Sequence, residues 1–160
     1  MSKIAGEYDC VAAQSINPSR LRRAHQTPCT PDMAYFLIAV MHDKLFGQSI
    51  MAPKVRLRAP RNGRHTARGW GGAIKDAKTG KLRGYVSLPE TPFNPAKHKT
   101  PYGFLRVGLV LHEYAHAVEM LRHGRTNHEA RFTMILDALL FESESLWAVA
   151  ESQIAAEVKA

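Results

Sequence analysis

The chain has 160 residues, of which 45% are hydrophobic, as is typical of one globular domain with one core. No stretch approaches the roughly 18 apolar residues of a membrane span, and the N-terminus lacks the apolar core of a secretory signal. We therefore expect a cytoplasmic protein with no membrane partner. The only two cysteines, Cys10 and Cys29, are too few and too far apart for a zinc ribbon, so a bound metal would need His or carboxylate ligands.

The formal net charge is +8, and its distribution is uneven. The segment from Lys54 to Arg83 holds ten basic residues and one acid, Asp76, which gives +9, whereas acids outnumber bases after His112. Such asymmetry predicts an anionic partner, DNA or another polyanion, bound by the basic segment. A solvated basic sheet face is the alternative. The basic residues are Lys54, Arg56, Arg58, Arg61, Arg64, Arg68, Lys75, Lys78, Lys81 and Arg83.

Residues 1–29 show no sustained periodicity and predict a partly ordered N-terminal arm with at most a short helix. Residues 30–160 are expected to form a single domain. Its first helix is predicted to begin at Thr30-Pro31, which supplies a capping hydroxyl and a proline in the first turn, and to end at Gly47.

A sheet region is expected next. Apolar and basic residues alternate from Lys54 to Arg58, as in a half-buried strand. Residues 76–80, DAKTG, then predict a hairpin turn between a strand that ends at Lys75 and a return strand that carries Leu82 and Val86. Four prolines between residues 89 and 101 predict a long irregular connection.

Helical periodicity returns from about Gly103 to Arg122, with Gly124 as the stop. Thr126 and Glu129 have the spacing of a capping box, which predicts a new helix near Asn127. Its apolar stripe, and a further one at residues 146–154, carry the helical pattern to the C-terminus.

The sequence HEYAH lies within the first of these helices. His112 and His116 are four residues apart, so their imidazoles share one helix face and are placed to bind one ion. Glu113 is placed to take a proton from a water that Zn²⁺ activates. With eight His and nine Glu, the composition gives roughly 0.02 chance matches to HExxH, which favours a metal site over a helix with two histidines on its wet edge.

The third ligand is less tightly defined by spacing. We expect His128, because a reversal at Gly124 would return it toward the site, with His123 as a second choice. Arg122 stands where the HExxHxxGxxH pattern requires His, which excludes that class. A carboxylate from the later helix would instead give a His2Glu site; its candidates are Asp137, Glu142 and Glu144.

HEYAHAVE, a turn, and then NHEARFTMILDALL together resemble the SprT-like (Spartan-like) zincin metallopeptidases over roughly residues 30–142. That group pairs HExxH with a third His, here His128, followed closely by an aromatic residue, here Phe132. Glu129 stands where the group usually has Gly, and the zinc ribbon of some members is absent.

The resemblance implies an α+β, zincin-like fold: a small antiparallel sheet packed on the HExxH helix, with a C-terminal helical region. It also implies Zn²⁺, a general-base Glu113 and hydrolysis of peptide bonds, with protein substrates that are bound to DNA. The alternative functions are a nucleic-acid-binding protein with a structural zinc and a regulatory protein that keeps the site but recognises one partner.

Overall fold

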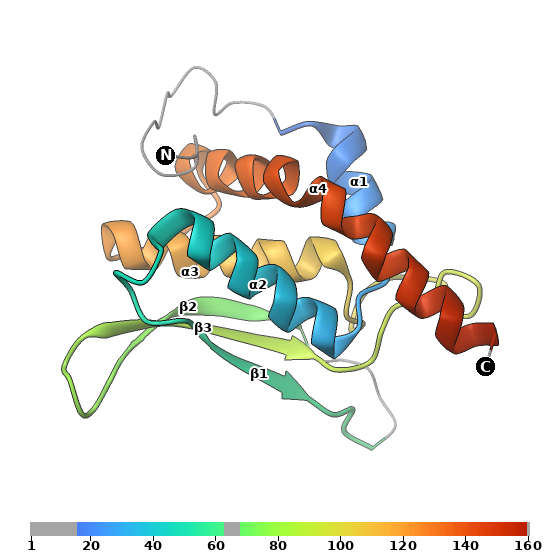
Figure 1. Ribbon diagram of the computed structural model, residues 1–160, viewed down its shortest axis with the longest axis horizontal. Helices are drawn as coiled ribbons and strands as arrows, with labels where there is room; N and C mark the ends of the chain where they lie inside the picture. The colour runs from blue at the N-terminus through green and yellow to red at the C-terminus, as the bar shows by residue number, and fades with distance from the viewer. Residues whose placement is uncertain (1–15, 63–67, 160) are drawn as a thin grey trace.

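The computed structural model describes residues 16–62 and 68–159, and has the α+β composition expected (Figure 1). Its elements, in chain order, are α1 (Pro18–Gln26), α2 (Pro31–Phe46), β1 (Lys54–Arg58), β2 (Trp70–Lys75), β3 (Leu82–Pro89), α3 (Val107–His123) and α4 (Ala130–Lys159).

The start of α2 is the one that the sequence predicts. The Thr30 side chain accepts a hydrogen bond from the Met33 N–H at 3.2 Å, and Gly47 ends the helix. The short helix expected in the N-terminal arm is α1, capped by the Asn17 side chain.

Ala24 of α1 is fully buried, and α1 packs against α3 and α4. Residues 1–15, which include Cys10, lie outside the described residues, and Cys29 is a buried free thiol.

The sheet differs from the expectation in one strand direction. β2 and β3 form the predicted antiparallel hairpin, with Lys75 opposite Leu82, but β1 pairs with β3 in parallel, so the sheet is mixed and ordered β1-β3-β2. The prediction of an antiparallel sheet is therefore wrong for β1. The alternation in Lys54–Arg58 reports which side chains are buried, and that pattern is the same whichever way the partner strand runs.

The helices α3 and α4 both begin a few residues C-terminal to their predicted starts. Residues 103–105 lead into α3 without helical structure, because the Leu105 N–H bonds the Thr91 carbonyl and the Leu105 carbonyl accepts from Phe93. α4 begins at Ala130 rather than near Asn127, since Thr126 bonds a histidine of α3 instead of capping a helix. Gly124, at φ 75°, ends α3 in the left-handed conformation that glycine favours.

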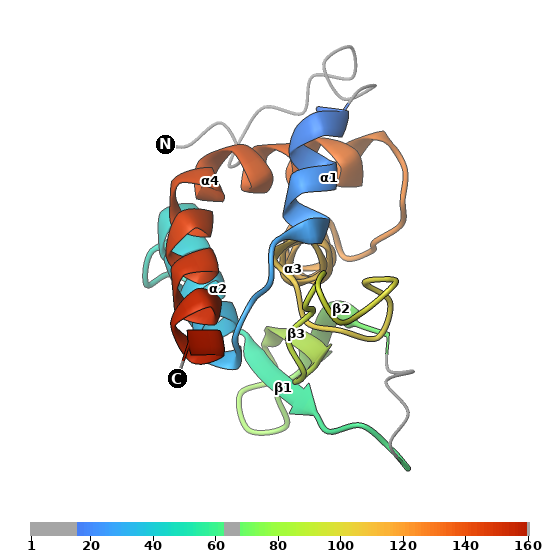
Figure 2. The same ribbon diagram turned by 90° about the vertical axis from the view of Figure 1, so that its right-hand side faces the viewer.

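One face of the sheet packs on α3, and all the described helices lie on that side (Figures 1 and 2). β3, the central strand, buries Val86 and Leu88 against the helices. α3 is the central helix of the fold, with the sheet on one side and α1 and α4 on the other (Figure 2). None of the helices in the described residues combines the length and the apolar composition needed to cross a membrane.

Candidate metal centre

Three histidines from two elements come together beside α3. His112 and His116 lie one turn apart on α3, and His128 lies in the turn that leads to α4. The Nε2 atom of His128 is 3.0 Å from that of His116 and 3.3 Å from that of His112. One nitrogen from each ring lies within 4.8 Å of the others, so these residues could hold a metal ion.

The spacing of the nitrogens suits a tetrahedral ion. Two ligands that each lie 2.0–2.1 Å from zinc at a tetrahedral angle are roughly 3.3 Å apart. The Nε2 separation of 3.3 Å between His128 and His112 equals that value, and the one of 3.0 Å between His128 and His116 is slightly shorter. Three imidazole ligands also leave the fourth tetrahedral position for a water or a substrate, as in catalytic sites.

The histidines of α3 are held in the neutral form that binds metals. Burial lowers the pKa of His112 to about 3, and the neighbouring histidines His116, His128 and His25 and the Arg106 guanidinium lower it further. Burial also lowers the pKa of His116 to about 4, with a smaller effect from His128. A metal therefore need not displace a proton from either ring at neutral pH.

Contacts outside the cluster fix the ring of His116. Its Nδ1 is 2.6 Å from the Thr126 hydroxyl, which leaves Nε2 facing the cluster. The Phe132 ring stacks on that of His116, at 4.2 Å and 24°, and its edge contacts with His112 and His128 close the apolar side of the cluster.

The turn that carries His128 is attached to α3 through Glu119, which is fully buried. One of its oxygens accepts the Asn127 N–H at 2.9 Å, and the other accepts from Nε of Arg131 at 3.0 Å. These two bonds bracket His128 in the sequence. They account for how a residue twelve positions after His116 returns to the same helix face.

Glu113 lies on α3 beside β2 and is 7% exposed. A Cβ at Gly71 would lie 1.8 Å from the Glu113 carbonyl oxygen, and one at Gly69 would lie 2.6 Å from the Glu113 Cγ, so glycine lets β2 approach the helix closely. Burial raises the pKa of Glu113 to about 7, against the opposing charges of Arg106 and Arg58. A carboxylate with this pKa can both accept and release a proton near neutrality.

The alternative ligands lie elsewhere. Asp137 accepts from the Asn17 N–H, and Glu144 pairs with Arg20 and Arg23 of α1. Glu142 faces Lys44 of α2, and His123, at the end of α3, is not part of the cluster.

Three residues around the site are not predicted from the sequence to belong to it: His25, Glu119 and Thr126. His25 is distant in sequence, Glu119 reads as an ordinary helical acid, and Thr126 has capping-box spacing. The polar groups of the turn after Gly124 suggest hydrogen bonds to a neighbouring element, but the sequence does not identify their partners.

Comparisons of the chain with protein-family models, with curated proteins and with solved structures gave no match.

Proposed function

We propose that the protein is a zinc-dependent metallopeptidase in which His112, His116 and His128 hold the ion and Glu113 is the general base. The observation that carries the proposal is the convergence of the three Nε2 atoms on an HExxH helix, with the Glu113 carboxyl buried one residue along. The order of α2, a small sheet and the metal helix fits the zincin-like fold of the SprT-like group.

The chemistry follows from where each group lies. Zinc at the three histidines would supply an activated water and a Lewis acid for the peptide carbonyl. Glu113 takes the proton of the attacking water on its carboxylate and then delivers it to the amine that leaves. Gly69, just before β2, lies directly against the Glu113 side chain, and this close contact limits the rotamers of Glu113. Thr126 keeps the Nδ1 side of His116 occupied so that Nε2 remains the metal-binding atom.

The experiment that tests this proposal separates metal binding from catalysis. The purified protein is expected to contain about one zinc per chain and to cleave a general substrate such as casein. Glu113→Gln should keep the zinc but lose hydrolysis by at least about a hundredfold, since an amide does not accept the proton. His112→Ala should lose both. Full activity in Glu113→Gln would rule out this general base.

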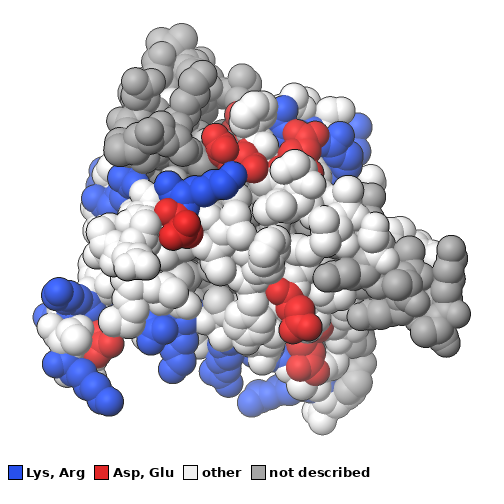
Figure 3. Space-filling model, viewed as in Figure 1, with Lys and Arg blue, Asp and Glu red and all other residues white. Residues whose placement is uncertain are grey.

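A second proposed property is nucleic-acid binding by the open face of the sheet. The strand register aligns Arg56, Ser87 and Trp70 in one row and Lys54, Tyr85 and Gly72 in the next, on the face opposite α3. Trp70 is 48% exposed and meets Tyr85 edge to face, which gives a surface with both cations and aromatic rings. Figure 3 shows Lys and Arg gathered along the lower edge, where Figure 1 places the sheet.

Not every residue of the basic segment belongs to this surface. Arg58 is half-buried, donates to the Arg68 carbonyl and places its charge near Glu113. Arg64 lies outside the described residues. Lys54→Ala with Arg56→Ala should therefore reduce the salt dependence of DNA binding by about 1.4–1.8 in log–log slope, which is 0.7–0.9 per phosphate contact. An unchanged slope would mean that Lys54 and Arg56 do not contact DNA phosphates and that the basic residues of this face are only solvated. Zinc-dependent binding with no proteolysis would favour a structural zinc.

A further inference from the structure

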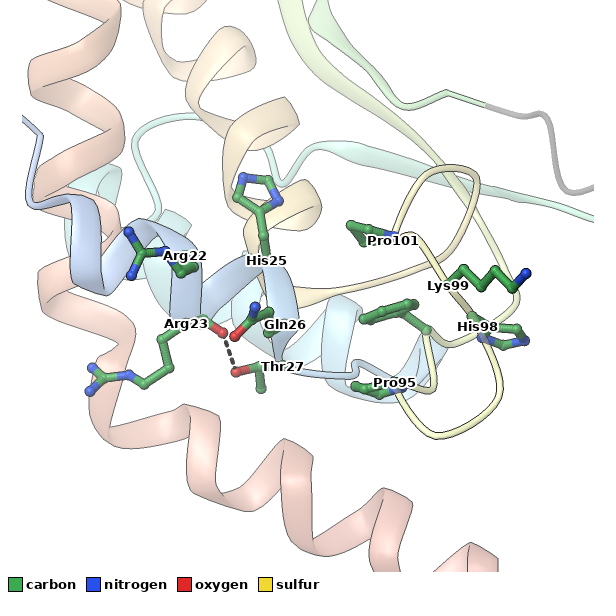
Figure 4. Close-up of a pocket in the computed structure, with 10 residues that line it drawn as sticks. Arg22, Arg23, His25, Gln26, Thr27, Pro95, His98, Lys99 and Pro101 are labelled. Atoms are coloured by element: carbon green, nitrogen blue, oxygen red, sulfur yellow. Dashed lines mark hydrogen bonds between the residues drawn. The ribbon is translucent and has the colours of Figure 1, made fainter.

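A cavity of about 780 Å³ lies between the C-terminal end of α1 and residues 93–101, and His25 forms part of its wall (Figure 4). This volume lies within the range of small-ligand sites, roughly 300–1,000 Å³. Phe93, Pro95 and Pro101 supply apolar lining.

The cavity adjoins the metal-binding face of α3 through His25. A Cβ at Gly108 would lie 2.6 Å from Cγ and from Nδ1 of His25, so the imidazole rests directly on the first turn of α3. Gly108 and His112 are four residues apart and therefore lie on the same helix face, one turn from each other.

The tautomer of His25 follows from its partner. Arg106 donates from Nε to His25 Nδ1 at 3.1 Å, and since a guanidinium has no acceptor, Nδ1 must carry the lone pair. Arg106 is itself 6% exposed and is fixed by the carbonyls of Pro101 and Phe104, at 2.6 and 2.8 Å. The proton of the neutral ring is therefore on Nε2, which has no hydrogen-bond partner among the described residues.

Three other polar side chains of the cavity, those of Arg22, Arg23 and His98, are engaged or turned aside. Arg23 pairs with Glu144 and lies over Trp147, and in Figure 4 both Arg22 and Arg23 extend away from residues 93–101. His98 accepts from the Asn94 N–H and stacks on Phe104. The donor left at the junction with α3 is a neutral N–H, which matches a peptide carbonyl rather than an anion.

We infer that this cavity holds a segment of the peptide substrate next to the metal centre, and that Nε2–H of His25 donates to a backbone carbonyl oxygen of that segment. The inference rests on the proposed metallopeptidase function. His25 would then be a substrate-binding residue that the HExxH motif does not predict.

The test uses two hydroxamates on the zinc-loaded protein. Acetohydroxamate contacts little beyond the metal, whereas a hydroxamate-capped Leu-Trp dipeptide also presents backbone carbonyls to the surrounding cleft. His25→Leu should weaken the dipeptide hydroxamate about three- to tenfold, the effect of one hydrogen bond, and leave acetohydroxamate unchanged. His25→Gln, whose amide can accept from Arg106 and donate to substrate, should recover part of the loss, and it serves if His25→Leu does not fold. Lys97→Ala, at an exposed lysine of the same segment that does not line the cavity, is the matched control and should leave the affinity for both hydroxamates unchanged.

The outcomes separate the two proposals. Equal affinity of wild type and both His25 variants for the dipeptide hydroxamate would overturn the role of His25 and leave the metallopeptidase proposal standing. Equal weakening of both probes would also overturn it, because the substitution would then act on the metal. If the wild type binds no acetohydroxamate, the proposal that the three histidines hold an accessible zinc ion is contradicted.

Discussion

The Thr126 hydroxyl lies 2.6 Å from Nδ1 of His116, and this contact joins the turn after α3 to a ring whose other nitrogen faces His128. A ring nitrogen that donates to an oxygen orients the imidazole and raises the basicity of the opposite nitrogen. The turn between α3 and α4 therefore brings in His128 and also holds His116 in the metal-binding orientation.

Thr126→Val tests this contact because it keeps the shape and removes the hydroxyl. Loss of a partner of this kind typically lowers metal affinity 10–100-fold, and we expect about tenfold weaker zinc binding. Thr126→Ser, which retains the oxygen, is the control and should bind zinc nearly as the wild type does. Competition with a chromophoric chelator measures both. Equal affinities in Thr126→Val and the wild type would show that the hydroxyl does not support His116.

The identity of the third ligand is tested by comparing two histidines on either side of Gly124, His123 at the end of α3 and His128 in the turn that follows. His128→Ala removes a nitrogen that lies 3.0 Å from His116 Nε2, whereas His123 is outside the cluster. We expect His128→Ala to weaken zinc binding by at least about a hundredfold and His123→Ala by less than about threefold. The Co²⁺-substituted proteins give a second measurement, since visible absorption reports loss of a nitrogen ligand. If His123→Ala weakened zinc binding more than His128→Ala, the third ligand would be His123 at the end of α3.

Glu119 should contribute more to protein stability and to zinc affinity than the neighbouring acidic residues do, because it holds the turn that carries His128. Glu119→Gln removes the charge that faces Arg131 and leaves a weaker acceptor for the Asn127 N–H. We expect a loss of about 1–3 kcal/mol in the free energy of unfolding of the zinc-free protein and at least about fivefold weaker zinc binding. Denaturant unfolding and chelator competition measure the two effects. Glu129→Gln, at an exposed acid of the same turn, should change neither; equal effects of the two variants would contradict a specific role for Glu119.

The parts of this site that the sequence predicts are the local ones. His112, Glu113 and His116 are placed by helical spacing alone, so their arrangement needs only α3 to form. His128 depends on Gly124 to reverse the chain, and that glycine is visible in the sequence. The bonds that complete the reversal join Glu119 to Asn127 and Arg131, and helical periodicity carries no information about such pairings.

The strand direction of β1 and the position of His25 were not predictable for the same reason, because both depend on contacts between residues that are distant in the sequence. Alternation identifies the buried side of β1, but it carries no information about the direction of the partner strand, and β1 pairs with β3 in parallel. His25 reaches α3 because Gly108 has no side chain and because Arg106 presents a donor, and these residues lie more than 80 positions from it. An isolated histidine in an arginine-rich helix has no local pattern that indicates such a contact.

The contact between His25 and Arg106 also predicts how stability depends on pH. Burial, and then the charge of Arg106, lower the pKa of His25 to about 4, from 6.5 in the unfolded chain. The unfolded chain therefore binds more protons between these values, so this part of the stability is fully present above pH 6.5 and is lost as the pH falls toward 4. The charged groups around His25 are Arg106 and the cavity residues Arg22, Arg23 and Lys99, and the nearby titratable group is His112.

His25→Gln removes this titration while it keeps an acceptor for Arg106. We expect the free energy of unfolding of the wild type to fall more steeply than that of His25→Gln between pH 6.5 and 4, so that any advantage of the wild type at pH 7 shrinks or reverses at pH 4.5. Urea unfolding in the presence of EDTA excludes the loss of zinc as a cause. The other histidines contribute to both proteins and cancel in the difference. Parallel pH profiles would mean that His25 takes up a proton in the folded state as readily as in the unfolded one, and that its Nδ1 is not held by Arg106.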